Sequence, residues 1–219
     1  MICLTVDVEE YNWPALRGKT SPDLGSTKYS FEGNKVLLTL FRRHKVRATF
    51  FVTGTFAQAH PEQVREIRAA GHEVGSHGFV HHYRNNARLN IEADVKKSKE
   101  VLEGILGEPI LGFRAPQVQY SPRILKAVAA AGFAYDSSLH PAFAPGYYSR
   151  KDQPLAPFKP VKNSGLVEVP LAVFPKSRLP ISWGAMRTLG AWWAIRACRQ
   201  LLEQRITPNL YVHSLEFVP

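Results

Sequence analysis

Short apolar segments with the composition of β-strands alternate with amphipathic helical segments along almost the whole chain. The strand candidates are 4–8, 47–52, 110–113, 133–135, 167–174 and 210–213. The helix candidates are 36–44, 61–70, 91–106, a helix from Pro122 that stops at Gly132, and 187–205. Repeated strand–helix units predict parallel strands with helices packed outside them, in an open sheet or a closed barrel. No glycine-rich loop with dinucleotide or P-loop spacing follows the first strand, which argues against a Rossmann domain.

Polar residues able to do chemistry fall at or just past the carboxyl ends of the predicted strands. They are Asp7, Glu9, His77, Arg114, Asp136 and His213. In a parallel barrel, this rim is where catalytic groups collect. The sequence therefore predicts an active site at the C-terminal rim of the strands.

Two carboxylates and two histidines in this set suit a metal centre. Asp7 and Glu9 are two residues apart and share one face of a strand, while His77 and His81 are four residues apart. Imidazoles and a carboxylate are ligands that zinc accepts, and a second carboxylate beside the metal can act as a base, which outlines a hydrolase. The same residue types also suit a two-histidine, one-carboxylate ferrous oxygenase. His82 is expected to face away.

The charge of the chain is unusual for its size. Of 219 residues, 28 are Lys or Arg and 18 are Asp or Glu, so the formal net charge is +10. This excess favours an anionic partner, such as an acidic glycan or an anionic membrane surface. The basic residues are spread along the chain without a nucleic-acid-binding motif, so we expect no nucleic-acid partner.

The length predicts a single domain over residues 1–219. Cys3 and Cys198 are the only cysteines and are expected to be two buried thiols, which is typical of a reducing compartment. Asp7 follows too soon after Met1 for a signal peptide, and no long apolar stretch predicts a membrane span. We therefore expect a cytoplasmic protein, with peripheral attachment to the inner membrane face as the alternative.

Five segments resemble, in order, the motifs of the polysaccharide deacetylases with NodB-type homology, carbohydrate esterase family 4. They are Thr5-Val6-Asp7-Val8-Glu9 for the family pattern Thr-Phe-Asp-Asp-Gly, His77-Gly78-Phe79-Val80-His81 for His-Ser-x-x-His, Arg114-Ala115-Pro116 for Arg-x-Pro, Tyr135-Asp136-Ser137-Ser138 for the Asp-centred motif, and Leu210-Tyr211-Val212-His213 for Leu-x-x-His. The resemblance covers essentially the whole chain, and the details look most like the bacterial exopolysaccharide-associated branch.

The resemblance implies a distorted (β/α) barrel with fewer than eight strands, a divalent metal and the removal of acetyl groups from N-acetylated sugars. The metal is expected to be Zn, with Co, Ni, Mn or Fe as alternatives. The implied partner is an N-acetylated polysaccharide or lipid-linked saccharide, with acidic forms among them. Two other functions stay open: a small-molecule amidohydrolase on the same fold, and a catalytically inactive glycan-binding domain.

One departure from the family pattern changes the expected ligand set. Val8 stands where the family has its second aspartate, usually a metal ligand, and valine cannot coordinate a metal. Glu9 shares a face with Asp7, so the expected ligands are Glu9, His77 and His81; the exchanged roles, with Asp7 on the metal and Glu9 as base, are the alternative. Ser214-Leu215 also replaces a Pro-Trp pair of related sequences, which alters the expected pocket wall.

The resemblance assigns the remaining roles residue by residue. Asp7 is expected to be the general base and His213 the general acid. Arg114 is expected to pair with Asp7, and Asp136 to orient His213 or to belong to the same charge network. A backbone amide near Tyr120 could bind the oxyanion.

Several aromatic residues are candidates for ligand contact. Tyr11, Trp13 and Trp183 suit stacking on sugars, with core packing as the alternative. In the predicted helix 187–205, Ile195 and Leu202 belong to the expected buried stripe, whereas Trp192 lies on the wet side beside Arg196 and Arg199. An exposed Trp beside two arginines could contact an anionic membrane or a glycan.

Overall fold

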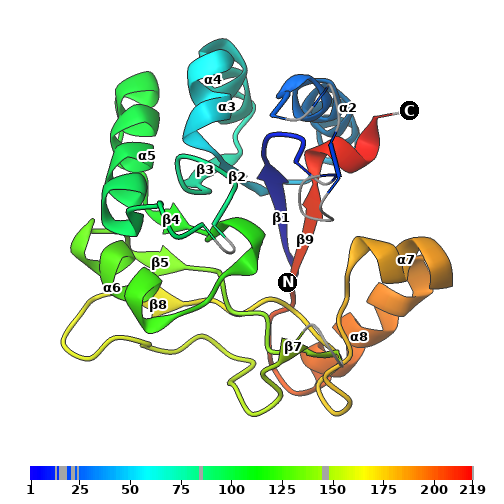
Figure 1. The fold of residues 1–219 in the computed structure, drawn as a ribbon. Coiled ribbons are helices and arrows are strands. Elements are labelled where there is room, and N and C mark those ends of the chain that lie inside the picture. The colour runs from blue at the N-terminus through cyan, green and yellow to red at the C-terminus, as the bar shows by residue number, and fades with distance from the viewer. Residues whose placement is uncertain are drawn as a thin grey trace.

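The structure is a computed structural model that describes residues 1–12, 14, 19–20, 23, 25–83, 86–144 and 148–218. Its dominant feature is a sheet of seven strands, all parallel, within these described residues (Figure 1). The strands are β1 (Cys3–Val8), β2 (Thr49–Val52), β3 (Glu73–Ser76), β4 (Gly112–Phe113), β5 (Tyr135–Asp136), β8 (Val167–Glu168) and β9 (Asn209–His213). Their order is β8-β5-β4-β3-β2-β1-β9, so the first strand pairs with the last.

The two edge strands, β8 and β9, meet through a few contacts instead of a ladder. The segment after β8 runs beside the start of β9, where Ala172 N–H donates to the Asn209 carbonyl oxygen at 2.8 Å. The Asn209 amide also donates to the carbonyl oxygens of Val169, at 3.2 Å, and Pro170, at 3.3 Å. The sheet is therefore curled into an incompletely closed barrel, which confirms the predicted distorted (β/α) barrel with fewer than eight strands.

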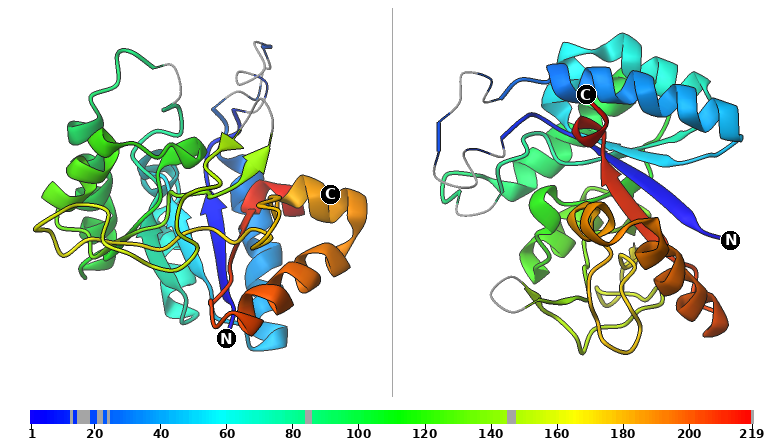
Figure 2. Two further views of the ribbon diagram at one scale, coloured as in Figure 1. Left: turned by 90° about the horizontal axis from the view of Figure 1, so that it is seen from below. Right: turned by 90° about the vertical axis from the view of Figure 1, so that its right-hand side faces the viewer.

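Helices cover the outside of this curled sheet (Figures 1 and 2). They are α2 (Lys28–His44), α3 (Gly54–Ala59), α4 (Pro61–Ala69), α5 (Ile91–Leu106), α6 (Pro122–Ala130), α7 (Trp183–Leu189) and α8 (Ala191–Glu203), with the short 3-10 turns η1 (Pro116–Val118) and η2 (Ser214–Phe217). Between β5 and β8, the chain forms a small antiparallel pair, β6 (Phe143–Ala144) and β7 (Tyr148–Ser149).

The core lies between the strands and these helices because the strands are rich in β-branched and aromatic residues. Val6, Val8, Phe50, Val52 and Phe113 are fully buried. Burial of such a side chain contributes about 1.5–3 kcal/mol each relative to exposure. This packing fixes the barrel, and with it the positions of the strand ends that carry the polar residues.

Helix α2 is longer than the sequence predicted. It begins at Lys28 instead of Val36, because the polar-looking segment before Val36 buries Ser30, Gly33 and Asn34. A Cβ atom at Gly33 would lie 1.8 Å from the Ser214 carbonyl oxygen, so glycine lets α2 approach η2 directly. Figure 2 shows this C-terminal turn lying against α2.

The predicted single helix 187–205 is wrong, since the structure has two helices that meet at Gly190. Gly190 has φ 85° and ψ 168°, a conformation that is essentially restricted to glycine. The resulting α8 buries Ala194, Ala197, Cys198 and Leu201 against a second, smaller hydrophobic cluster.

Two further expectations about burial are corrected. Ile195 and Leu202, predicted to be buried, are 51% and 40% exposed. Cys198 is buried, but Cys3 is exposed because it opens β1 at the surface, and both thiols are free. Within the part of the chain that the structure describes, no helix combines the length and the apolar character needed to cross a bilayer.

Candidate metal centre and active site

A buried ion pair lies under the rim of the barrel, where β1 and β4 end. Arg114 is completely buried, and its Nη1 lies 2.8 Å from Asp7 Oδ1. The same guanidinium donates to Thr5 Oγ1 at 2.8 Å and, through Nε and Nη2, to the Ser137 carbonyl oxygen and hydroxyl at 3.0 and 2.9 Å. Its plane also lies over the Phe51 ring, 4.3 Å from the centroid. Asp7 is therefore held in one orientation, as predicted for the Asp7–Arg114 pair.

Next to this pair, Glu9, His77 and His81 converge, all of them buried. One ligand atom from each lies within 4.8 Å of the other two. Glu9 Oε2 is 2.7 Å from His81 Nε2 and 3.5 Å from His77 Nε2. Burial alone would raise the pKa of Glu9, but the positive charges of His81 and His213 and the proximity of the His77 and His81 imidazoles hold that pKa well below its usual range. The carboxylate is therefore ionised.

The distal nitrogens of both imidazoles are engaged in a way that leaves their Nε2 atoms for the cluster. His77 Nδ1 lies 2.8 Å from the Arg114 carbonyl oxygen and donates to it. His81 Nδ1 lies 2.7 Å from the Asn12 amide nitrogen, and Asn12 Oδ1 has no partner among the described residues. A half-turn of the Asn12 amide exchanges its nitrogen and oxygen, so that Oδ1 accepts the Nδ1–H of His81. This pattern is the one that orients metal-binding histidines.

These residues fit a divalent metal. His77 Nε2 is buried with no hydrogen-bond partner among the described residues, which is costly unless a ligand takes its lone pair. With metal–ligand bonds of about 2.0–2.2 Å, the edge of a tetrahedron is about 3.4 Å. The Glu9–His77 separation of 3.5 Å matches this edge, and the Glu9–His81 contact of 2.7 Å is a hydrogen bond that a bound metal would replace.

The segment between the two histidines is fixed by Asp94, near the start of α5. Asp94 accepts hydrogen bonds from the amides of Phe79, at 2.8 Å, and Val80, at 3.3 Å, and from the Tyr83 hydroxyl at 2.6 Å. Gly78, where the family pattern has serine, has φ 71°, and a Cβ atom there would lie 2.8 Å from the Tyr83 hydroxyl. His81 is thus presented to the cluster, whereas His82 is exposed, as expected.

His213 ends β9, the neighbour of β1, and its register pairs it with Asp7. Its Nδ1 lies 2.9 Å from Glu216 Oε1, and its backbone N–H donates to Glu216 Oε2 at 2.9 Å. Burial alone would lower the pKa of His213, but the charges of Glu9, Glu216 and Asp7 and the hydrogen bond to Glu216 raise that pKa to about 9. The imidazole is therefore protonated at neutral pH.

Asp136 occupies a different place from the one predicted for an orienting residue. It accepts a hydrogen bond from the Ser138 hydroxyl at 2.7 Å and shares a hydrogen bond with the buried Glu168. Burial and the neighbouring Asp136 raise the pKa of Glu168 to about 11, so Glu168 is protonated and donates to Asp136. Glu216 is the carboxylate that orients His213. The second expectation for Asp136, membership of one charge network, agrees with its electrostatic interaction with Arg114.

A pocket of about 970 Å³ opens beside His213. Tyr11, Trp183 and Tyr211 give it an aromatic lining, and the exposed Lys19 and Arg187 give it positive charge. Leu215 and Glu216 line the pocket together with His213, so one residue of the replaced Pro-Trp pair belongs to this wall. Trp13, a further candidate for stacking, lies outside the described residues.

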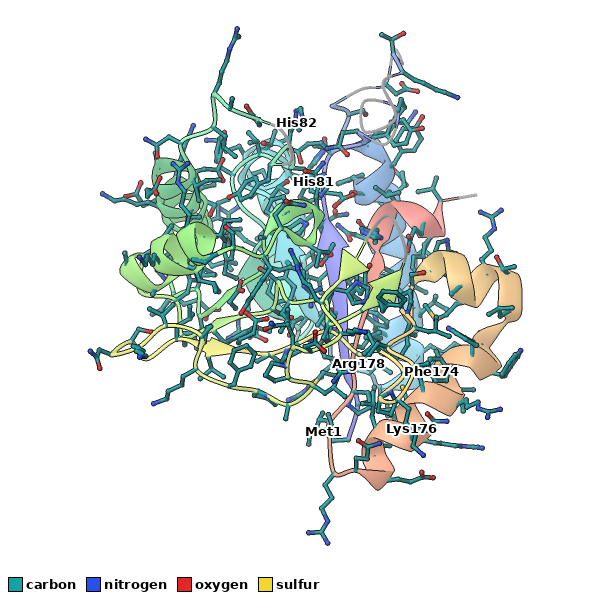
Figure 3. All side chains as sticks on the ribbon, turned by 60° about the horizontal axis from the view of Figure 1, so that its bottom comes forward. Met1, His81, His82, Phe174, Lys176 and Arg178 are labelled. Atoms are coloured by element: carbon teal, nitrogen blue, oxygen red, sulfur yellow. The ribbon has the colours of Figure 1, made fainter. Side chains whose placement is uncertain are left out.

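Figure 3 shows where this site lies in the molecule. The side chain of His81 lies at the opposite end from Met1, which is toward the carboxyl ends of the strands. Glu9, His77, Arg114 and His213 directly follow or end β1, β3, β4 and β9. The structure thus brings together at one rim the residues that the sequence placed at strand ends.

Sequence reasoning missed the residues that orient the site. Glu216, Asn12, Asp94 and Glu168 belong to none of the motifs described above, and the roles of the last three depend on contacts between separate segments of the chain. Of these four residues, only Glu216 could have been found from the sequence, because a carboxylate three residues after a histidine at the end of a strand can hydrogen-bond to that histidine.

Taken together, fold and site define an α/β-barrel protein with a candidate metal centre at the carboxyl rim of its strands. The sequence profile of the polysaccharide deacetylase family matches residues 29–135, a segment that includes His77, His81 and Arg114. This match, which covers just under half of the chain, agrees with the resemblance of its motifs to the NodB-type polysaccharide deacetylases.

A curated relative is similar to this chain in sequence, and two solved structures share its fold. The chain is 36% identical to a peptidoglycan deacetylase of Helicobacter pylori over 137 residues, which are 61% of this chain and 46% of the relative. It thus spans about half the length of this curated relative. A protein from Mycobacterium smegmatis assigned as a polysaccharide deacetylase has the same fold, with a TM-score of 0.70 at 24% identity over 98% of this chain and 76% of that one. An allantoinase shares the fold too, with a TM-score of 0.66 at 18% identity over 98% and 77% of the two chains.

Proposed function

We propose that the chain is a divalent-metal-dependent deacetylase that hydrolyses the N-acetyl group of a glycan. The observation that carries this proposal is the buried cluster of Glu9, His77 and His81 beside the Asp7–Arg114 pair. The family match and the peptidoglycan deacetylase activity named for the Helicobacter pylori relative support the same chemistry.

Glu9 and the Nε2 atoms of His77 and His81 would hold the cation, most simply zinc. When bound, a divalent cation polarises the acetyl carbonyl and makes a water molecule more acidic. Asp7 would take the proton of the attacking water as general base, with its carboxylate held by Arg114. Glu9 is favoured over Asp7 as the ligand because Glu9 is the carboxylate that faces both imidazoles.

Cleavage of the amide C–N bond requires a proton on the departing sugar nitrogen. His213 is suited to supply it, because it is protonated at neutral pH and is a strand neighbour of Asp7. Glu216 fixes the orientation of the imidazole through Nδ1, and Nε2 is the nitrogen that would donate. The products are acetate and the free amine.

The pocket beside His213 supports a saccharide substrate. Aromatic side chains at Tyr11, Trp183 and Tyr211 offer faces on which sugar rings stack, and Lys19 and Arg187 suit an acidic glycan. The exposed residues in its lining open the pocket to solvent, which favours a glycan over a small cyclic amide. Assignment to the exopolysaccharide-associated branch, a lipid-linked substrate and a cytoplasmic location all stay predictions.

Metal content and acetate release test this proposal together. We expect the purified protein to contain about one divalent metal per chain by elemental analysis, and to release acetate from N-acetylated glycans. Replacement of both His77 and His81 with Ala should abolish both properties. Full metal content in that double variant would contradict the ligand set, and metal without acetate release on any N-acetylated glycan would favour an inactive glycan-binding domain.

The roles of the two carboxylates are separated by isosteric variants. Asp7→Asn should keep the metal, because the ligands are unchanged, and lower kcat by about 10²–10⁴-fold, the usual contribution of a general base. Glu9→Gln should lose most of the metal. The opposite pair of results would exchange the roles of Asp7 and Glu9.

A further inference from the structure

Half of the net positive charge of this protein comes from one segment near the end of the chain. Residues 175–205 hold six basic side chains and one acidic one, a net charge of +5, which is half of the +10 of the whole chain. This segment contains α7 and α8, and Figures 1 and 2 show both helices together at one side, next to β9.

The outward side of α8 is apolar as well as basic. Trp192, Ile195 and Leu202 are 53%, 51% and 40% exposed. Their spacing of three and seven residues puts them on one side of the helix, opposite the buried Ala194 and Leu201. Arg196 and Arg199 follow Trp192 by four and seven residues and lie on the same side. We call these five residues, Trp192, Ile195, Arg196, Arg199 and Leu202, the α8 outer face.

The two arginines of the α8 outer face are available for a partner. Arg196 and Arg199 are exposed, and neither has a carboxylate partner within the described residues. A helix face that is only solvated carries charged and polar residues, and has no reason to expose a tryptophan, an isoleucine and a leucine together. Glu203, four residues after Arg199, is exposed on the same side of α8, so the two arginines outnumber the acidic side chains there by one. A tryptophan and large aliphatic side chains beside an excess of arginine are the pattern of helices that lie in the interface of an anionic bilayer.

We propose that the α8 outer face docks on the surface of an anionic lipid bilayer. The arginines would pair with lipid phosphates, while Trp192, Ile195 and Leu202 would enter the boundary between headgroups and acyl chains. The charge and the apolar character of this face together favour an anionic bilayer. A neutral bilayer would not match the arginines, and an acidic protein surface would not match the exposed apolar side chains.

Docking in this way has a consequence for the active-site pocket. Helix α7 lines the pocket beside His213 through Trp183 at its start and Arg187 in its last turn, and α7 packs against α8. The helix pair therefore connects the bilayer contact to the pocket wall. If the proposed deacetylase function holds, glycans attached to or lying on that bilayer would be the substrates nearest to the site.

Vesicle co-sedimentation tests the docking. The protein should bind vesicles of phosphatidylglycerol and phosphatidylcholine at low salt, bind vesicles of phosphatidylcholine alone only weakly, and lose affinity as salt rises. Combined Arg196→Glu and Arg199→Glu should weaken binding by about 25-fold or more, because each basic residue near an anionic surface is worth about fivefold. Combined Trp192→Ser and Ile195→Ser should weaken it also at low salt.

A charge-matched control shows whether vesicle binding depends on the α8 outer face or only on the net charge of the protein. Arg42→Glu with Arg43→Glu, on the exposed side of α2, changes the net charge by the same amount and should leave vesicle binding nearly unchanged. Circular dichroism and thermal melting should show that all variants fold. Acetate release from a soluble N-acetylated oligosaccharide should be the same in every variant, so failure of the docking and failure of the proposed catalysis are distinguishable.

Three outcomes would overturn the proposal. They are absence of vesicle binding by the unchanged protein, equal loss in the α2 control variant, and a dimer in light scattering that Trp192→Ser converts to monomer. The last result would assign the α8 outer face to a second copy of the chain.

Discussion

At the scale of single residues, the proposed acid depends on a partner outside the recognised motifs. Glu216 accepts from His213 Nδ1 at 2.9 Å and is one cause of the raised pKa, about 9, of that histidine. A general acid must be protonated to work, so activity should persist through neutral pH and fall only above about pH 9. The same contact keeps the ring in one orientation.

Glu216→Gln tests this arrangement. The amide can still accept from Nδ1, but it removes a negative charge, so the pKa of His213 should fall. The alkaline limb of kcat/KM should then move to lower pH by about one unit, with metal content unchanged. An alkaline limb that stays in place would mean that another group supplies the proton.

A second residue-scale feature is the buried acid pair beneath Arg114. Glu168 has a pKa of about 11, mainly because burial disfavours its charged form and Asp136 lies next to it. The unfolded chain would ionise Glu168 above its ordinary pKa, so this residue makes the free energy of unfolding decrease as pH rises through the neutral range. The protonated carboxyl group of Glu168 thus makes the folded protein less stable as the pH rises.

Glu168→Gln mimics the protonated form of this residue. Its oxygen can accept the Leu139 amide, now 2.9 Å from Glu168 Oε1, and its nitrogen can donate to Asp136. The variant should be more stable than the natural chain at neutral pH. Its advantage should grow by about 1 kcal/mol per pH unit between about pH 5 and about pH 8 in urea unfolding. An advantage that does not depend on pH would show that Glu168 is ionised in the folded protein.

At the scale of elements, Gly190 decides how the last helical region is built. A continuous helix 187–205 was the prediction from hydrophobic spacing, because one glycine inside a helical pattern is tolerated. In the structure, Gly190 is both the end of α7 and the start of α8. The break rotates α8 so that Ala194 and Leu201 face inward and Ile195 faces out, which periodicity across the break could not reveal.

Gly190→Ala should therefore be destabilising. The side chain would have to adopt φ 85°, and its Cβ atom would lie 3.3 Å from Trp192 Cδ1. We expect a loss of about 1–3 kcal/mol in the free energy of unfolding. Gly104→Ala in α5 is the control, because its Cβ atom meets nothing within 4 Å, and it should stabilise by about 0.5–1 kcal/mol. Equal effects of the two substitutions would mean that the break at Gly190 is not required.

At the scale of the whole molecule, the sequence predicted the barrel and the contents of its rim. Alternation of apolar strands and amphipathic helices gave the parallel strands, and Asp7, His77, Arg114 and His213 could be placed because carboxyl ends of parallel strands share one rim. The family resemblance added the chemical roles. It also pointed to Glu9 once Val8 had removed the usual ligand.

What could not be predicted are contacts made between distant segments. Asn12 contacts His81 across 69 residues, and Asp94 holds Phe79 across 15. The long start of α2 was missed because its buried face consists of serine, glycine and asparagine instead of apolar residues. In each case the determining factor is a partner that only the folded chain supplies.

The pairing of the first strand with the last has a consequence for how the chain is made. Thr5 on β1 donates to the Leu210 carbonyl oxygen on β9, which is 205 residues further along. At about 5–20 residues per second, a ribosome needs on the order of 10–40 s to deliver that partner. For this time one edge of β1, with its apolar side chains, has no neighbour. Once His77 and His81 have been made, Glu9 has its histidine partners, whereas Asp7 still lacks its strand neighbour His213. A nascent chain can thus complete its metal ligands well before its proton donor emerges, and it has an open strand edge that a chaperone would have to shield.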